Sequence, residues 1–218
     1  MPRSRRKPPP RGREAAKAFR RQQLIASTID CIAKRGFAET TLALVAEGAG
    51  LSRGIVNLHF KSKKQLLVET LRYLAEEYRA VWIRAVEKAG PGPADKLAAM
   101  VEADFDRSVC NRKKIAVWYA FWGESKSRPT YLAVCGQSDE EYSRVMADLC
   151  AATIDEGGYQ DVDPKQIADG LNAMLNGFWL DLLLDPASFD RDGLKRTAFA
   201  YLASYFPDHF KEVRRSAA

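Results

Sequence analysis

The chain has 218 residues, of which 46% are hydrophobic and 28% charged, a composition typical of a folded globular protein. It contains no run of about 18 uninterrupted apolar residues and begins without the apolar stretch of a signal peptide, so we expect a cytoplasmic protein with no membrane partner. The formal charge of +6 is unevenly distributed: residues 1–64 carry 15 Lys and Arg against 4 Asp and Glu, whereas the rest carry 19 against 24. A net of +11 followed by a net of −5 predicts that only the first segment binds a polyanion.

Residues 1–19 are expected to form a flexible basic arm. The first thirteen residues are rich in Arg, Lys and Pro and cannot bury enough apolar surface to offset the entropy lost on ordering. Two interpretations remain open for this arm: it reaches into a DNA minor groove, or it is only a solvated tail.

The first predicted helix runs from Arg20 to Gly36. Its apolar positions recur at helical spacing: Leu24, Ile25, Ile29 and Ile32. Gly36 follows the last of them, as a glycine at the C-terminal end of a helix does.

Two short helices are predicted next, joined by a tight turn. Thr41 caps the first, whose buried face is formed by Leu42, Val45, Ala46 and Ala49. Gly50 breaks that helix, and Ser52 caps a second one that directs Ile55 and Val56 inward and ends near Phe60. This order predicts a helix-turn-helix and a DNA-binding domain over residues 20–66.

The second short helix carries residues suited to reading DNA. Arg53, Asn57 and Lys61 share the face opposite the apolar one, and Arg and Asn pair with guanine and adenine edges in the major groove. The candidate DNA-binding residues are Thr41, Ser52, Arg53, Gly54, Asn57, Leu58, His59, Lys61 and Lys63. The alternative is a generic charged helix face, but the preceding short helix and turn favour DNA contact.

Residues 67–210 are predicted to form a larger helical domain that senses a ligand and dimerises. A capping box at Ser62 and Gln65 begins a long helix that ends near Gly90. Further helices are expected over residues 94–105, 112–124, 129–156, 164–184 and 190–205. Asp163, Pro164 and Gln166 mark one of these starts clearly, and no segment has the alternation of a strand. The predicted fold is all-α.

The residues of the helix-turn-helix resemble a known family. Residues 40–54 and 59–63 are similar to the DNA-binding domain of TetR-family transcriptional repressors, and residues 20–25, 105–106, 118–122 and 176–180 are similar to the BetI group of that family. The resemblance implies a homodimer that represses genes for making glycine betaine from choline and leaves operator DNA when choline is present. Arg53 and residues 57–59 depart from the recognition helix usual in that group, so the alternative is a TetR-family repressor of other genes that responds to another small molecule.

Aromatic residues in the larger domain are candidates for holding that inducer. Trp118 and Trp122 share one helix face, and a later helix carries Trp179. A quaternary ammonium cannot donate a hydrogen bond, so proteins hold it against aromatic faces, each contributing up to about 2 kcal/mol. The candidate ligand residues are Phe105, Trp118, Tyr119, Trp122 and Trp179, with charge complementarity from Asp106 or Glu124. The alternative is that these rings are ordinary core.

The last two helices are expected to form the dimer interface, because a helix-turn-helix reads two half-sites about 34 Å apart. Their apolar residues are Leu171, Met174, Leu175, Phe178, Leu182, Leu194, Phe199, Leu202 and Tyr205, and the alternative is burial within one chain.

The sequence has no Gly-rich phosphate loop, no nucleophile motif and no His-based metal cluster, so we expect neither an enzyme nor a cofactor or metal site. The four cysteines are expected to be reduced and buried. A nonspecific architectural nucleic-acid binder is the alternative from another class, since the basic segment alone permits it.

Overall fold

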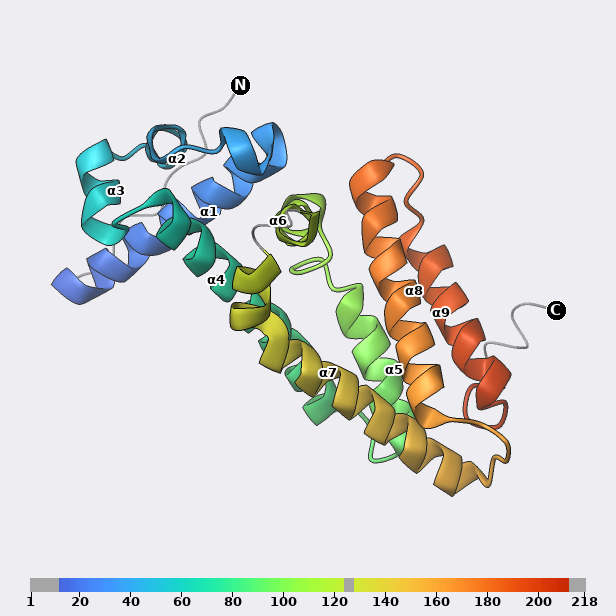
Figure 1. Cartoon of the computed structure of the whole chain (residues 1–218). Coiled ribbons are helices and arrows are strands. Elements are labelled where there is room, and N and C mark those ends of the chain that lie inside the picture. Colours follow the sequence, from blue (N-terminus) through green and yellow to red (C-terminus); the bar gives the residue numbers. More distant parts are fainter. Residues whose placement is uncertain (1–11, 124–127, 212–218) are drawn as a thin grey trace. The chain divides into compact units, whose positions relative to one another are not determined.

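The computed structural model describes residues 12–123 and 128–211 (Figure 1). Every regular element in these two ranges is a helix, which confirms the predicted all-α fold. Residues 1–11 of the expected arm, and Glu124, lie outside the described residues. The chain divides into two compact units between Tyr73 and Leu74.

The first helix, α1 (Arg13–Glu39), begins seven residues earlier than the predicted start at Arg20. The prediction of a flexible arm is therefore wrong for residues 13–19. Ala15, Ala16 and Ala18 are strong helix formers, and they extend the amphipathic helix that follows them toward the N-terminus. Gly36 has φ +83° and ψ 172°, so the regular helix is interrupted there, as its sequence position predicted.

The predicted pair of short helices is confirmed as α2 (Leu42–Ala49) and α3 (Arg53–His59). The Thr41 hydroxyl accepts a hydrogen bond of 3.2 Å from the amide of Leu44, and the Ser52 hydroxyl accepts one of 3.4 Å from the amide of Ile55. Gly50 adopts the left-handed conformation, with φ +63°, that lets the chain turn between the two helices.

The first unit has a small apolar core that fixes α3 against its neighbours. Five of its fully or nearly fully buried side chains are Leu24, Ile25, Val45, Val56 and Phe60. Each such side chain contributes about 1.5–3 kcal/mol by leaving water. The Ser27 hydroxyl donates a hydrogen bond of 2.8 Å to the Val45 carbonyl. A Cβ at Gly48 would lie 2.5 Å from that hydroxyl oxygen, so the close packing of α2 on α1 requires glycine here.

The helix α4 (Lys63–Lys88) contributes its first residues to the first unit and the remainder to the second. The second unit continues with α5 (Pro93–Asp104), α6 (Arg112–Gly123), α7 (Arg128–Gly157), α8 (Pro164–Leu184) and α9 (Arg191–Tyr205). Within this unit α5, α7 and α8 lie side by side, and α9 packs on α5 and α8 (Figure 1). The Asp163 carboxylate caps α8 at the amides of Lys165 and Gln166, as predicted.

The core of the second unit contains several of the residues that had been assigned to a dimer interface. Leu171, Leu175 and Leu202 are buried in their own chain, so their assignment to an intersubunit contact is wrong. The large apolar side chains that remain exposed on α8 and at the end of α9 are Leu180, Leu184 and Tyr205. Among the described residues, none of the helices is both long and apolar enough to span a bilayer.

Candidate DNA-binding face and ligand pocket

The exposed side of α3 carries the residues that the sequence suggested for reading bases. Val56 is fully buried and anchors the helix, whereas Arg53 and Asn57 are exposed. Lys61 is exposed too, but α3 ends at His59, so Lys61 lies just beyond the helix and not on its face as the sequence predicted. Leu58 is 75% exposed on the same helix, so its side chain is available to a partner. The helix therefore presents a polar face with one apolar side chain, a combination suited to base edges and a thymine methyl group. DNA contact by each of these residues stays a prediction.

Lys63 and His59 differ from the other candidates because each is engaged within the unit. The Lys63 ammonium donates a hydrogen bond of 2.8 Å to the Ala38 carbonyl and lies 6.0 Å from the centre of the Phe37 ring. The pKa of His59 is lowered, first by burial and then by the positive charges of Lys17 and its neighbours on α1, so the imidazole is neutral at physiological pH. Lys63 is therefore already hydrogen-bonded and His59 is neutral, whereas the positive charge of Lys61 is exposed to solvent.

The first turns of α1 add a basic surface that the sequence prediction treated as part of the arm. The Arg21 guanidinium lies 5.7 Å from the centre of the Phe60 ring, at the end of α3. This contact places the first half of α1 beside the recognition helix. Arg13, Lys17 and Arg20 are exposed on that part of α1, at spacings of four and three residues that bring them to one side of the helix.

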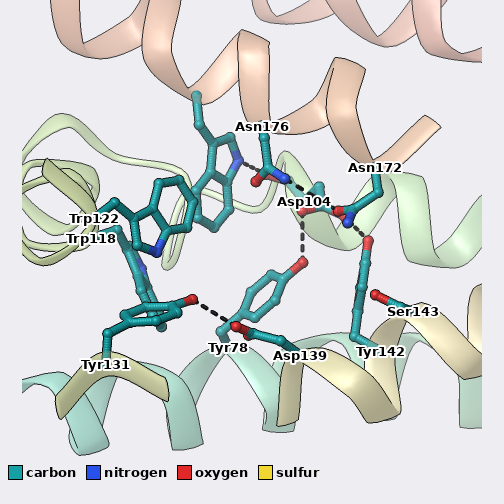
Figure 2. Close-up of a pocket in the computed structure, with 11 residues that line it drawn as sticks. Tyr78, Asp104, Trp118, Trp122, Tyr131, Asp139, Tyr142, Ser143, Asn172 and Asn176 are labelled. Atoms are coloured by element: carbon teal, nitrogen blue, oxygen red, sulfur yellow. Dashed lines mark hydrogen bonds between the residues drawn. The ribbon is translucent and has the colours of Figure 1, made fainter. Parts of the chain in front are cut away.

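The second unit contains a pocket of about 140 Å³ (Figure 2). Its lining comes from five helices and consists of Tyr78, Asp104, Trp118, Trp122, Tyr131, Asp139, Tyr142, Ser143, Asn172, Asn176 and Trp179. Three of the predicted ligand residues, all tryptophans, are thus brought together in space. The sequence could not show this, because helix periodicity does not say which faces meet.

Phe105 and Tyr119, the other two predicted ligand residues, lie outside this lining. The Phe105 ring packs against Phe178, with 6.1 Å between the ring centres. The Tyr119 hydroxyl donates a hydrogen bond of 2.7 Å to the Asn176 carbonyl, and its ring packs edge-on against Trp122. Tyr119 thus contacts two residues of the lining, Asn176 and Trp122, from outside the pocket.

Asp104 is the buried acid of the pocket. It is 5% exposed and accepts hydrogen bonds from the hydroxyls of Tyr78, at 2.8 Å, and Tyr142. Burial raises the pKa of this carboxyl to about 6, and the two tyrosine hydroxyls oppose that rise. The Trp179 indole nitrogen donates to the backbone carbonyl of the same residue at 2.9 Å. A carboxylate that is only partly compensated therefore faces a space enclosed by aromatic rings.

The aromatic wall is held by edge-to-face contacts, which leave ring faces available. Trp118 and Trp122 both pack nearly perpendicular to Tyr131, with ring centres 6.2 and 6.0 Å apart. Tyr78 makes a similar contact with Trp179 at 5.5 Å. These contacts stabilise the rings by about 0.5–1.5 kcal/mol per pair beyond the area they bury, so the wall is ordered without a ligand.

Among the described residues, the lining of the pocket includes two acids and no basic side chain. Asp106, one of the two acids suggested for charge complementarity, is exposed, lies outside this lining and accepts a hydrogen bond of 2.7 Å from the Ser108 amide. The acids are Asp104, two positions earlier, and Asp139 on α7. One signal pointed to Asp104, since it lies on the apolar face of α5 with Met100 and Val101. No comparable signal marked Tyr78, Tyr142 or the two asparagines of α8.

Within the described residues, no group of His, Cys, Asp and Glu has an arrangement that could hold a metal ion. The four cysteines are buried as free thiols.

Family models match both parts of the chain. The model described as "Bacterial regulatory proteins, tetR family" matches residues 24–70, and the one described as "BetI-type transcriptional repressor, C-terminal" matches residues 93–207. The HTH-type transcriptional regulator BetI of Stenotrophomonas maltophilia is 31% identical over 194 residues, covering 87% of this chain and 94% of its own. The regulator of the same name from Paraburkholderia xenovorans is 34% identical over 185 residues, covering 84% of this chain and 92% of its own.

Solved structures give the same fold. A putative transcriptional regulator from Pseudomonas aeruginosa PAO1 superimposes with a TM-score of 0.73 at 26% identity, over 92% of this chain and 94% of that one. A putative transcriptional regulator from Saccharomonospora viridis, crystallised in complex with choline, superimposes with a TM-score of 0.74 at 20% identity, over 85% of this chain and 96% of that one.

Proposed function

The chain belongs to the TetR family of bacterial regulatory proteins and has a BetI-type C-terminal domain, and from this premise we propose that choline is its inducer and that it controls glycine betaine synthesis. The protein is a DNA-binding transcriptional repressor, not an enzyme. The choline response is supported by the chemistry of the pocket, and the regulated pathway by the relatives named BetI.

The observation that carries the proposal is the position of Asp104 among aromatic rings. A quaternary ammonium ion cannot donate a hydrogen bond, so it is bound by ring faces and by a negative charge at van der Waals distance. Asp104 supplies that charge, and Trp118, Trp122 and Trp179 line the same pocket. The two acids of the lining, with no basic side chain among its described residues, favour a cation over an anion as the ligand.

The relative from Saccharomonospora viridis adds independent support, because a protein of the same fold was crystallised with choline. At 20% identity this likeness concerns the fold, so the ligand of the present protein is argued from its own pocket residues.

Two copies of the chain are needed to read a palindromic operator, since one helix-turn-helix contacts one half-site. We assign the dimer contact to α8 and α9, where Leu184 is 72% exposed and Leu180 and Tyr205 are each 36% exposed. Exposed apolar side chains on two adjacent helices suit a self-complementary four-helix interface.

Induction then follows from linkage. If choline binds the DNA-incompetent arrangement of the dimer more tightly, it weakens operator affinity by a coupling free energy that is typically about 1–3 kcal/mol. Operator DNA weakens choline binding by the same factor, because the coupling is reciprocal.

The experiment that tests this function is fluorescence-polarisation binding to DNA from upstream of the protein's own gene and its neighbours. Scrambled DNA of equal length is the control, and each titration is run with and without choline. Selective binding that choline weakens supports the whole proposal. Selective binding indifferent to choline rejects the inducer and keeps the repressor, whereas equal affinity for scrambled DNA favours a nonspecific binder.

A further inference from the structure

The two acids of the pocket lie at different depths. Asp104 is 5% exposed and bonded to two tyrosine hydroxyls, so it belongs to the floor. Asp139, from α7, lines the same pocket and is exposed as a whole residue, although burial of its carboxyl group raises the pKa of that group, so it lies nearer the opening than Asp104 does. In Figure 2 both carboxyl groups face the space bounded by the tryptophans and tyrosines. The pocket thus offers a ligand one acid at each end.

The carboxylate of Asp139 is held in place by a hydrogen bond to one of its two oxygen atoms. Its Oδ2 atom accepts a hydrogen bond of 2.7 Å from the Tyr131 hydroxyl, and the Tyr131 ring is fixed by its edge contacts with Trp118 and Trp122. In residues 12–123 and 128–211, no Lys or Arg side chain belongs to the pocket lining to neutralise this acid. An ionised carboxylate accepts at both oxygens, so the second oxygen remains available to a ligand.

We propose that Asp139 determines which quaternary ammonium compound induces the repressor, by accepting a hydrogen bond from a hydroxyl at the ligand's far end and repelling a carboxylate there. The inference rests on the proposed function, because it assumes that the ammonium group occupies the floor beside Asp104. With the ammonium buried, the other end of a small ligand extends toward the opening, where Asp139 lies. An alcohol donates to the free oxygen, whereas the carboxylate of a betaine meets a like charge.

The remaining polar residues of the lining do not provide this discrimination. Ser143, Asn172 and Asn176 are neutral and carry both donors and acceptors, so they can hydrogen-bond to an alcohol or to a carboxylate. Asp104 attracts the ammonium group of both compounds equally. A charge-based preference for the alcohol therefore depends on Asp139.

The test uses three probes on the full-length protein: choline, tetramethylammonium, which lacks the hydroxyl arm, and glycine betaine, which has a carboxylate in its place. Dissociation constants are measured by calorimetry for the wild type, for D139N and for the control D148N, which changes an exposed acid on the same helix outside the pocket. Asparagine keeps the size of the side chain and an acceptor for Tyr131. Circular dichroism and thermal unfolding show whether each variant is folded.

We expect D139N to weaken choline by about tenfold or more, because a hydrogen bond to a charged acceptor contributes about 1.5–3 kcal/mol. Glycine betaine should bind D139N more tightly than the wild type, and tetramethylammonium should change least. An equal loss for choline and tetramethylammonium overturns the proposal, since Asp139 would then act only as a general counter-charge. If the wild type binds neither choline nor tetramethylammonium, the proposed ligand class is overturned as well. If D139N leaves the affinities for all three probes unchanged, only the proposed role of Asp139 is rejected.

Discussion

The hydroxyl of Tyr78 donates a hydrogen bond of 2.8 Å to the carboxylate of Asp104, joining α4 to the end of α5 across 26 positions of the chain. Because α4 also begins directly after the recognition helix, the residue that contacts the pocket acid lies on the element that continues into the DNA-binding unit. Asp104 is therefore the first residue to substitute in a test of ligand binding.

The substitution D104N should weaken choline binding by at least about tenfold. Asparagine fits the same space and still accepts hydrogen bonds, but it removes the negative charge at the floor of the pocket, a loss of about 2 kcal/mol or more. Titration followed by tryptophan fluorescence measures the change. The matched control is D106N, whose carboxyl lies outside the pocket lining; an equal effect of both substitutions would show that position 104 has no special role.

Choline affinity should fall as the pH decreases through about 6. Burial raises the pKa of Asp104 to about 6, so the carboxyl is ionised above that pH and neutral below it, and only the ionised form attracts a cation. The pKa values of Tyr78 and Tyr142 are well above their usual range, so both hydroxyls remain protonated throughout. Calorimetry at pH 5, 6 and 7.5 measures the slope, which should be smaller in D104N. Burial also raises the pKa of Asp139 in the same pocket, so a weaker pH dependence remains in that variant.

Lys61 and Lys63 should respond differently to replacement by alanine. K61A should weaken binding to operator and scrambled DNA alike and lower the slope of log affinity against log salt by about 1, because one phosphate contact is lost. K63A should instead lower the free energy of unfolding, by up to about 1 kcal/mol, because its ammonium is bound to the Ala38 carbonyl. Salt-dependent binding and urea denaturation separate the two effects; identical salt slopes for both variants would contradict the assignment.

The basic face at the start of α1 should contribute to the electrostatic part of DNA binding. Replacing Lys17 and Arg20 together by glutamine should reduce the salt slope by about 2 and leave the preference for operator over scrambled DNA unchanged. Lys34 and Arg35, exposed on the same helix near its other end, provide the control pair. Were the control pair to lower the slope equally, the effect would reflect net charge rather than position.

The substitution L184E should convert the dimer to a monomer. Leu184 is 72% exposed on α8, and a carboxylate at this position would have to be desolvated in the proposed interface. Light scattering coupled to size exclusion measures the mass. L132E, which changes a leucine 57% exposed on α7, is the control and should leave the mass unchanged.

The local structure was largely predictable from the sequence, because short-range chemistry determines it. Thr41, Ser52 and Asp163 cap helices in the structure as they were expected to, and Gly50 makes the expected turn. The early start of α1 was missed since the prolines and arginines before it suggested an unstructured tail, although three alanines follow.

The pocket was predictable only in part. Aromatic residues at helical spacing indicated which rings were available, but the side of α5 that faces inward is determined by how five helices pack. Asp104 and Asp106 are two residues apart at the end of one helix, and tertiary packing buries the first and exposes the second. Tyr78 and Tyr142 come from helices far apart in the sequence, so no local pattern could join them to the acid.

The two hydrogen bonds to Asp104 also restrict how this regulator can evolve. Replacing the acid by an apolar residue would leave two buried tyrosine hydroxyls without an acceptor, each costing about 1–3 kcal/mol of stability. A descendant adapted to a neutral inducer could therefore replace the acid by asparagine, which still accepts hydrogen bonds, but could adopt an apolar residue at position 104 only if both tyrosines changed as well. The two tyrosines thus restrict position 104 to side chains that accept hydrogen bonds, whatever the inducer.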